Sequence, residues 1–221
     1  MTPDKAGVAA AGKDAETPRR ISRGPYRNGR RTRGQIVAEA MTAIAERGFH
    51  GTSLRSIAAA VGISPAALLR HFESKDGLLT AVLKTWALLS DDLQGLDLRG
   101  LQRWRAQHDV MVWHTANRGL LVFFITLAAE ATSADHPARE YMVPRYQTAV
   151  DLFATSLIEA AEDGEIAPLT LAEARIEARA LLSFMDGIEI QWLLDPDLDM
   201  VGEVDIFVAH TLERLQNRRQ H

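Results

Sequence analysis

The sequence predicts an all-α fold in which a small helical domain precedes a larger one. Almost every segment after residue 34 repeats apolar residues with a period near 3.6, and no short run alternates as a half-buried strand does. The length of 221 residues suits one large or two small domains, and 47% hydrophobic with 24% charged residues is typical of a folded chain. We therefore expect a basic arm over 1–31, a first helical domain over 32–90 and a second over 91–221.

The first helix is predicted from Thr32 to Arg47. Its core face consists of Ile36, Val37, Ala40, Met41 and Ile44. Gly48 ends it, because glycine adopts the left-handed backbone that terminates helices without a Cβ penalty. A second, shorter helix begins after Thr52 or Ser53, since either side chain can accept a hydrogen bond from the free N–H groups of the first turn.

The third helix follows a sharp turn at Gly62. Ser64 is placed to cap this helix, and Pro65 suits its first position because the ring already has a helical φ. Leu68 and Phe72 lie four residues apart and face the core.

The fourth helix begins after Ser74 and is long enough to connect two domains. Gly164 ends one later helix, and Thr170 with Glu173 forms the T-x-x-E capping box that begins another. The later helices are predicted over 101–115, 119–131, 137–163, 170–194 and 200–217.

Charge divides the chain more sharply than its net value of −4 suggests. Residues 1–90 contain 14 Lys and Arg against 7 Asp and Glu, a charge of +7, whereas 91–221 contain 11 against 22, a charge of −11. Residues 1–34 alone contain nine basic and three acidic residues. Such an arm is either a solvated tail without a specific role or a segment that contacts nucleic acid.

Several classes of protein are excluded by what the sequence lacks. There is no cysteine, so a disulfide scaffold, a thiol enzyme and a Cys-ligated zinc module are ruled out. The longest apolar run, 119–129, is far shorter than the roughly 20 residues of a membrane helix. Val8 to Ala11 is too short for an export signal. We expect a cytoplasmic protein without a membrane partner.

The second and third helices form a helix-turn-helix over 53–72. Apolar residues on both helices lock the angle between them, which leaves the other face of the third helix free to enter a DNA major groove about 12 Å wide. Helical hairpins are also common in cores, so the pattern alone does not establish DNA binding.

Three stretches resemble the TetR-type DNA-binding domain. They are Thr52-Ser53-Leu54-Arg55-Ser56-Ile57-Ala58, Val61-Gly62-Ile63-Ser64 and His71-Phe72-Glu73-Ser74-Lys75-Asp76-Gly77-Leu78-Leu79. The likeness covers about residues 32–82. A looser likeness to the family's ligand-binding and dimerisation domain lies at 181–187 and 191–196. The resemblance implies a homodimeric repressor that binds a palindromic operator and releases it when a small molecule enters the acidic domain.

The same resemblance selects residues for DNA binding. Arg70 is expected to read guanine, and Ala66 or Ala67 to contact thymine methyl groups. The family's tyrosine in the third helix is absent here, because Leu69 takes its place. Arg70 has an alternative role as a surface partner of an acidic residue. The candidate DNA-contacting residues are Arg30, Arg31, Arg33, Thr52, Ser53, Arg55, Ser64, Pro65, Ala66, Ala67, Leu69, Arg70, His71 and Lys75.

The acidic domain is expected to bind the effector and the second subunit. The candidate pocket residues are Trp104, His108, Met111, Trp113, Phe123, Phe124 and Tyr146, although the same residues also suit a core. The candidate dimer residues are Tyr146, Val150, Phe153, Leu157, Leu181, Phe184, Met185, Ile188 and Trp192, unless they are buried within one subunit. The coupling between effector and operator is expected to pass along the fourth helix.

No cofactor and no metal is expected. His108 and His114 lie six residues apart, so they occupy different faces of a helix and do not share an ion. An enzyme is the alternative of a different class, but the sequence offers no Gly-rich phosphate loop and no nucleophile–base motif. A helical adaptor that keeps the fold without DNA binding is the other alternative.

Overall fold

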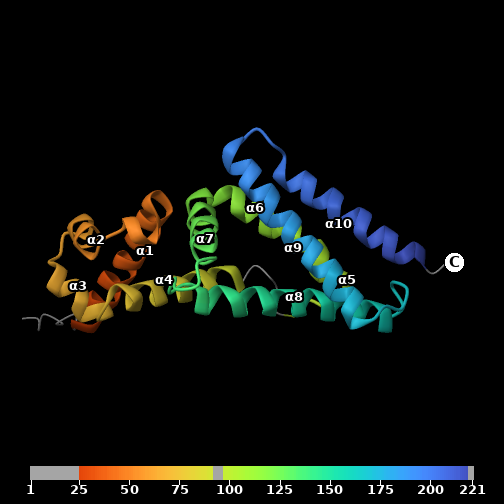
Figure 1. Cartoon of the computed structure of the whole chain (residues 1–221), viewed down its shortest axis with the longest axis horizontal. Coiled ribbons are helices and arrows are strands. Elements are labelled where there is room, and N and C mark those ends of the chain that lie inside the picture. Colours follow the sequence, from red (N-terminus) through yellow and green to blue (C-terminus); the bar gives the residue numbers. More distant parts are fainter. Residues whose placement is uncertain (1–24, 92–96, 219–221) are drawn as a thin grey trace, which may run out of the picture.

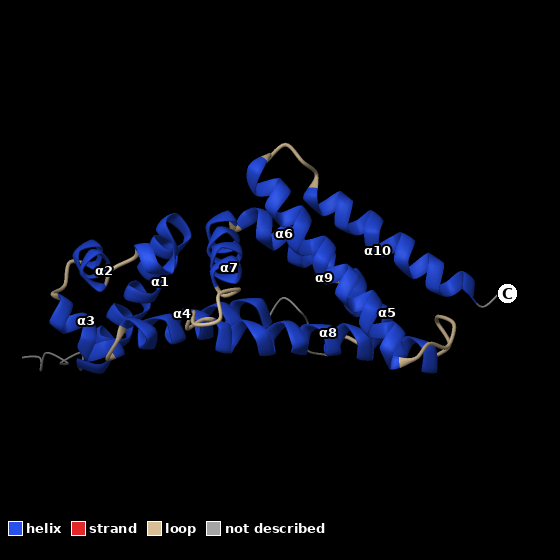
Figure 2. Ribbon diagram, viewed as in Figure 1, coloured by secondary structure: helices blue, strands red, loops and turns tan. Residues whose placement is uncertain are grey.

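The computed structural model describes residues 25–91 and 97–218, and all regular structure in these ranges is helical (Figures 1 and 2). The prediction of an all-α fold is therefore confirmed. Arm residues 1–24 and the side chains of Arg30 and Arg31 lie outside the described part of the chain.

Helix α1, Pro25–Gly51, begins earlier and ends later than the sequence predicted. Pro25 opens it, as proline suits the first turn of a helix, and residues 25–31 continue it although their glycine and arginines favoured an arm. The backbone at Gly48 leaves the helical region with φ 71°, so the helix is interrupted there as predicted before one more turn forms.

Helices α2, Leu54–Val61, and α3, Pro65–Phe72, have the predicted boundaries. Ser53 caps α2 and accepts a hydrogen bond from the Ser56 N–H at 3.1 Å. Gly62 adopts the left-handed conformation between the two helices, with φ 75°. Ser64 caps α3 by accepting from the Ala67 N–H at 3.1 Å. These contacts fix both ends of the turn.

Helix α4, Lys75–Asp91, leads from the first domain toward the second. Its buried residues Leu78, Leu79 and Val82 pack with α1 and α3, and Trp86 extends the same core to α7. One continuous core therefore joins α1–α4 with α7.

The second domain contains α5 to α10. Their bounds are α5 Gly100–Arg105, α6 Gln107–Ala116, α7 Arg118–Glu130, α8 Arg139–Glu162, α9 Leu171–Leu194 and α10 Met200–Asn217. The predicted helix over 101–115 is divided at Ala106 into α5 and α6. The capping box of Thr170 and Glu173 is present at the start of α9.

The first domain and the α9–α10 pair lie at opposite ends of the molecule (Figure 1). Helix α7 stands between them and packs against α1, while α8 extends beneath α9. No single helix in the described ranges is long and apolar enough to cross a membrane. The pair 100–116 and 118–130 reaches that composition only jointly, and it is bent by 101°.

Candidate nucleic-acid interface and effector pocket

The helix-turn-helix is held by a small apolar core. Ile57, Ala58, Leu68 and Phe72 are buried between the helices, as the sequence predicted. The backbone N–H of Ile63 donates to the Ala58 carbonyl at 2.9 Å, which closes the turn. The two helices therefore have a fixed mutual orientation.

The other face of α3 is open. Pro65, Ala66 and Arg70 are exposed, Leu69 is 39% exposed, and His71 is half-buried. An α-helix with its side chains is about 10–12 Å across, so α3 fits a major groove about 12 Å wide. Within the described ranges, no ion pair or hydrogen bond joins Arg70 to an acidic residue, and Glu46 pairs with Arg47 instead.

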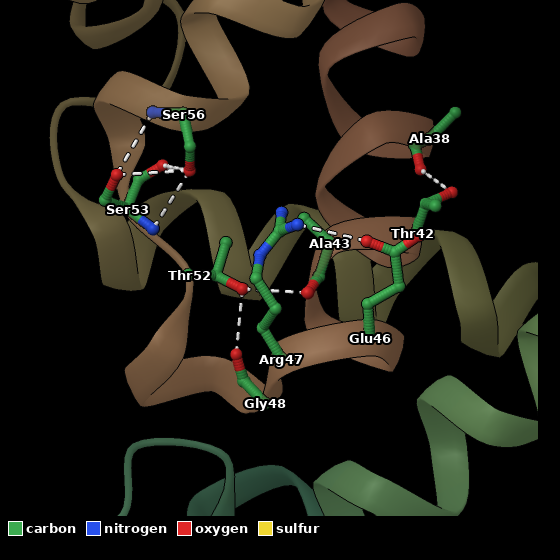
Figure 3. Close-up of polar contacts among 9 residues, drawn as sticks. All are labelled: Ala38, Thr42, Ala43, Glu46, Arg47, Gly48, Thr52, Ser53 and Ser56. Carbon is green, nitrogen blue, oxygen red and sulfur yellow. Dashed lines mark hydrogen bonds and ion pairs between the residues drawn. The ribbon is translucent and has the colours of Figure 1, made fainter.

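Ser53 and Arg55 are both exposed at the start of α2. The Ser53 hydroxyl and the Ser56 hydroxyl form the reciprocal cap drawn in Figure 3. Helix N-termini favour anions, since their free N–H groups and dipoles point outward. This end of α2 therefore has the chemistry that a DNA phosphate requires.

Thr52 does not have that role, and its assignment as a DNA contact is wrong. Its side chain is buried at 2% exposure. The hydroxyl lies 3.0 Å from the Ala43 carbonyl and 2.8 Å from the Gly48 carbonyl, so it joins the end of α1 to the start of α2 (Figure 3). A buried hydroxyl with two such partners has no path to a phosphate.

Arg33 and Lys75 are also turned toward the protein. Arg33 donates from Nη1 to the His71 carbonyl at 3.2 Å, and its guanidinium lies 4.4 Å from the centre of the Phe72 ring. Lys75 donates from Nζ to the Phe49 carbonyl and lies 4.2 Å from the centre of that ring. Burial lowers the pKa of Lys75. In this arrangement both cations join helices of the first domain, Arg33 as an exposed residue and Lys75 as a half-buried one.

A polar cavity lies among α4, α6, α7, α8 and α9 and has a volume of about 50 Å³. Its aromatic walls include Trp86, which stacks on Phe124 with ring centres 5.1 Å apart. Its polar side chains are Gln107, His114, Arg145, Tyr146, Asp186 and Glu189. Aromatic walls with a few converging polar groups are typical of small-molecule sites.

The carboxyl groups of this cavity are paired with neighbours. Glu189 is 3% exposed, and its Oε1 lies 2.8 Å from His114 Nδ1. Tyr146 donates its hydroxyl proton to Asp186 at 2.9 Å. Burial raises the pKa of Asp186 to about 6, and burial together with the Asp186 charge raises the pKa of Tyr146. Asp186 therefore titrates near neutrality.

Only two of the predicted pocket residues, Phe124 and Tyr146, line this cavity. Trp104, Met111 and Phe123 are buried elsewhere in the core, and Trp113 packs edge-on against Trp86. His108 is exposed and pairs with Asp205 at 2.8 Å. Sequence reasoning treated His114 only as a metal candidate. It missed Arg145, Asp186 and Glu189, for which no motif gives a signal.

A larger, open hollow of about 1170 Å³ lies between α1, α4 and the start of α7. Its floor is apolar, with Val37, Met41 and Leu120, and charged side chains such as Lys84 and Arg118 lie among its lining. The small cavity has the buried polar groups that fix a ligand's orientation, whereas the open hollow has the volume that ligand pockets need, about 300–1,000 Å³.

The predicted dimer residues are mostly buried within the subunit, which corrects their assignment. Those below one tenth exposure are Val150, Phe153, Leu157, Leu181, Met185, Ile188 and Trp192. Tyr146 is bonded to Asp186, and Phe184 stacks on Phe207 with ring centres 4.4 Å apart. These side chains face neighbouring helices because α9 packs on both α8 and α10.

Another face of α9 is apolar and open. Its residues recur at steps of four and three, the spacing of a helix–helix seam. They are Ile176, Ala180, Ser183, Gly187, Ile190 and Leu194. Ile176 is 65% exposed and Leu194 is 82% exposed. We name these six residues the α9 seam.

Comparison with known proteins gives a consistent result. Residues 36–82 match the family model described as bacterial regulatory proteins, tetR family. The chain is 32% identical over 112 residues to the HTH-type transcriptional repressor KstR2 of Rhodococcus jostii, and the match covers 51% of this chain and 48% of the relative. It thus spans about half the length of that relative.

Solved structures extend the likeness to most of the chain. A TetR transcriptional regulator from Chloroflexus aurantiacus has a TM-score of 0.74 at 21% identity, covering 85% of this chain and 96% of that one. AibR, in complex with isovaleryl coenzyme A and operator DNA, has a TM-score of 0.62 at 22% identity, covering 84% and 98%. At these identities the likeness concerns the fold.

Proposed function

Because the chain belongs to the TetR family of bacterial regulatory proteins, we propose that it is a repressor that binds a palindromic operator as a homodimer and releases it when a small molecule binds. The curated relatives it matches are transcriptional regulators and not enzymes. We also propose that it acts in the cytoplasm, where bacterial DNA lies.

The open face of α3 is the observation that carries this proposal. Arg70 reads a guanine from the last turn of the helix, and Ala66 packs against a base methyl group. Ser53, Arg55 and Ser64 bind phosphates at the starts of α2 and α3, where the helix dipoles favour anions. The revised contact set omits Thr52 and gives Lys75 and Arg33 a supporting role.

The α9 seam forms the homodimer in this proposal. Two copies of the seam face each other about a twofold axis, so each residue meets a residue of the same set. Ala180, Ser183 and Gly187 are small and allow the helices to approach closely, while Ile176, Ile190 and Leu194 bury apolar surface at both ends.

The polar cavity widens to receive the effector, because its volume of about 50 Å³ is below the roughly 300–1,000 Å³ of ligand pockets. The crystal structure of AibR contains both isovaleryl coenzyme A and operator DNA, which supports a small-molecule response in a protein of this fold. A ligand shifts the protein toward a state that binds DNA poorly by its difference in affinity for the two states, typically about 1–3 kcal/mol.

Titration of labelled DNA from upstream of the protein's own gene tests the DNA-binding function. We expect specific binding by the full chain, and a loss of about 10- to 100-fold in affinity for Arg70→Ala. Arg105→Ala is the matched control, because Arg105 is exposed on α5 in the second domain, and its affinity should not change. Absence of specific binding by the full chain would favour the helical adaptor.

The basic arm is a separate part of the proposal. Residues 1–24, which precede α1, contain two lysines and three arginines, and an arm before a helix-turn-helix can follow phosphates or enter the minor groove. A chain lacking residues 1–24 keeps α1 whole. It should bind the operator more weakly and with a shallower dependence on salt, since fewer counterions are released. An unchanged salt slope would contradict a role for the arm.

A further inference from the structure

Where α1 packs against the second domain, side chains from other helices hold the backbone of Phe49. The N–H of Phe49 donates to Glu130 Oε2 at 2.8 Å, and the Phe49 carbonyl accepts from the Lys75 ammonium and, at 3.3 Å, from the Thr52 N–H. Glu130 is the last residue of α7 in the second domain, whereas Lys75 begins α4. Both polar groups of Phe49 are thus held by side chains from other helices.

Because Gly48 has no side chain, the Glu130 carboxylate fits against the backbone of α1 at this residue. Its φ of 71° is in the left-handed region, and a Cβ built on it would lie 2.3 Å from Glu130 Oε1. The Glu130 carboxylate therefore lies directly against the backbone of α1 at its interruption. His136 closes the contact from the loop before α8, with Nε2 3.6 Å from Glu130 Oε2 and its ring centre 5.2 Å from that of Phe49.

The backbone of Phe49 lies just before the helix-turn-helix. Thr52 ties the Gly48 carbonyl to the start of α2, and Ser53 next to it is the N-cap of α2. Phe49 itself is buried at 4% exposure. A displacement of the Phe49 peptide is therefore transmitted to α2 through buried contacts and not through a loose linker.

The other end of the path lies in the polar cavity. Phe124 lines that cavity and is on α7, six residues before Glu130. Six residues of helix span about 9 Å, and a hydrogen-bonded helix moves nearly as a rigid body over that length. One helix thus bears both a cavity wall and the side chain that holds Phe49.

We propose that Glu130 is a positioning residue that couples the effector cavity to the DNA-reading helices through its hydrogen bond to the Phe49 N–H. This inference rests on the proposed function. It differs from a route along α4 alone, because the connection runs from α7 to α1. Without the bond, the reading helices sample several orientations, and operator affinity falls with the fraction that fits the DNA.

The test compares Glu130→Ala with Glu130→Gln, with operator affinity, hydrogen exchange and the free energy of unfolding as readouts. Gln keeps an oxygen acceptor and loses only the charge, whereas Ala removes the acceptor. We expect Ala to weaken operator binding about tenfold and Gln to retain most of it. The Phe49 amide should exchange faster only in the Ala variant. Glu140→Ala, an exposed residue at the start of α8, is the control.

Salt dependence separates positioning from phosphate contact. The slope of log affinity against log salt should be the same in all four proteins, because Glu130 adds no phosphate contact. Wild-type affinity in Glu130→Ala, with an unchanged Phe49 amide, would overturn the coupling while leaving the proposed function intact. Loss of affinity in proportion to loss of folded protein would also overturn it. No operator binding by the wild-type chain would overturn the proposed function and the coupling together.

Discussion

The stability of the first domain depends on the hydroxyl of Thr52, which joins the end of α1 to the start of α2. Thr52→Val keeps the shape of the side chain but leaves the Gly48 and Ala43 carbonyls without their hydroxyl partner. We expect the first domain to lose about 1–3 kcal/mol of unfolding free energy, the usual effect of an unsatisfied buried group. Urea unfolding measures this. Thr52→Ser keeps the hydroxyl and should lose less, and the reverse order would contradict the hydrogen-bonding role.

Asp186 gives the second domain a pH dependence of stability. Its pKa is about 6 in the folded protein, against an ordinary value of 3.8 in the unfolded chain. Because the folded state binds the proton more tightly, this group stabilises the fold fully below about pH 4, and the stabilisation disappears as the pH rises through 6. The change is of the order of 1–3 kcal/mol.

Asp186→Asn should remove that component. The unfolding free energy of the wild type should fall between pH 4 and 7 more steeply than that of the variant, as measured by urea titration at several pH values. Asp109→Asn, on an exposed residue of α6, is the control and should keep the wild-type slope. Parallel curves for wild type and Asp186→Asn would show that Asp186 has an ordinary pKa.

At the scale of elements, the turn between α2 and α3 depends on one backbone conformation. A Cβ added at Gly62 meets no atom within 4 Å, so Gly62→Ala costs only the left-handed φ of 75°. That cost is about 1–2 kcal/mol. Gly119→Ala, in the first turn of α7, also meets no atom within 4 Å and should stabilise or be neutral. Equal effects of the two substitutions in chemical denaturation would contradict this account.

The helices were predictable because their ends have strong local signals. Ser53, Ser64 and the Thr170 capping box act within four residues, so their effect can be read without tertiary information. The break at Ala106 has no such signal, since alanine favours helix. The early start of α1 was missed because Pro25 is followed by residues that resemble an arm.

Of the candidate DNA-binding site, only the exposed face of α3 could be predicted from the sequence. The α3 face follows from the pattern of Leu68 and Phe72, which determines which side is buried. Whether Thr52 and Lys75 face DNA or the protein depends on Phe49 and Gly48, which lie far away in sequence from Lys75. The cavity combines side chains from five helices, and no sequence period reveals that convergence.

For the whole molecule, the α9 seam makes a clear prediction about mass. Ala180→Glu places a carboxylate in the seam, where it would be buried against the apolar residues of the second copy without a partner charge. Light scattering should give twice the chain mass of 24.4 kDa for the wild type and the chain mass itself for the variant. Val143→Glu, on an exposed position of α8, should leave the dimer intact. A dimer that survives Ala180→Glu would exclude the seam.

The separation of the two ends in Figure 1 gives the molecule an electric polarity. Residues 25–90 have a charge of +5 and residues 97–218 a charge of −10. The field of a polyanion exerts a torque on such a distribution, so the protein turns α2 and α3 toward DNA before any contact forms. The net negative charge of the protein repels DNA and slows their approach at long range. The dipole, in contrast, raises the fraction of encounters with DNA that begin in the correct orientation.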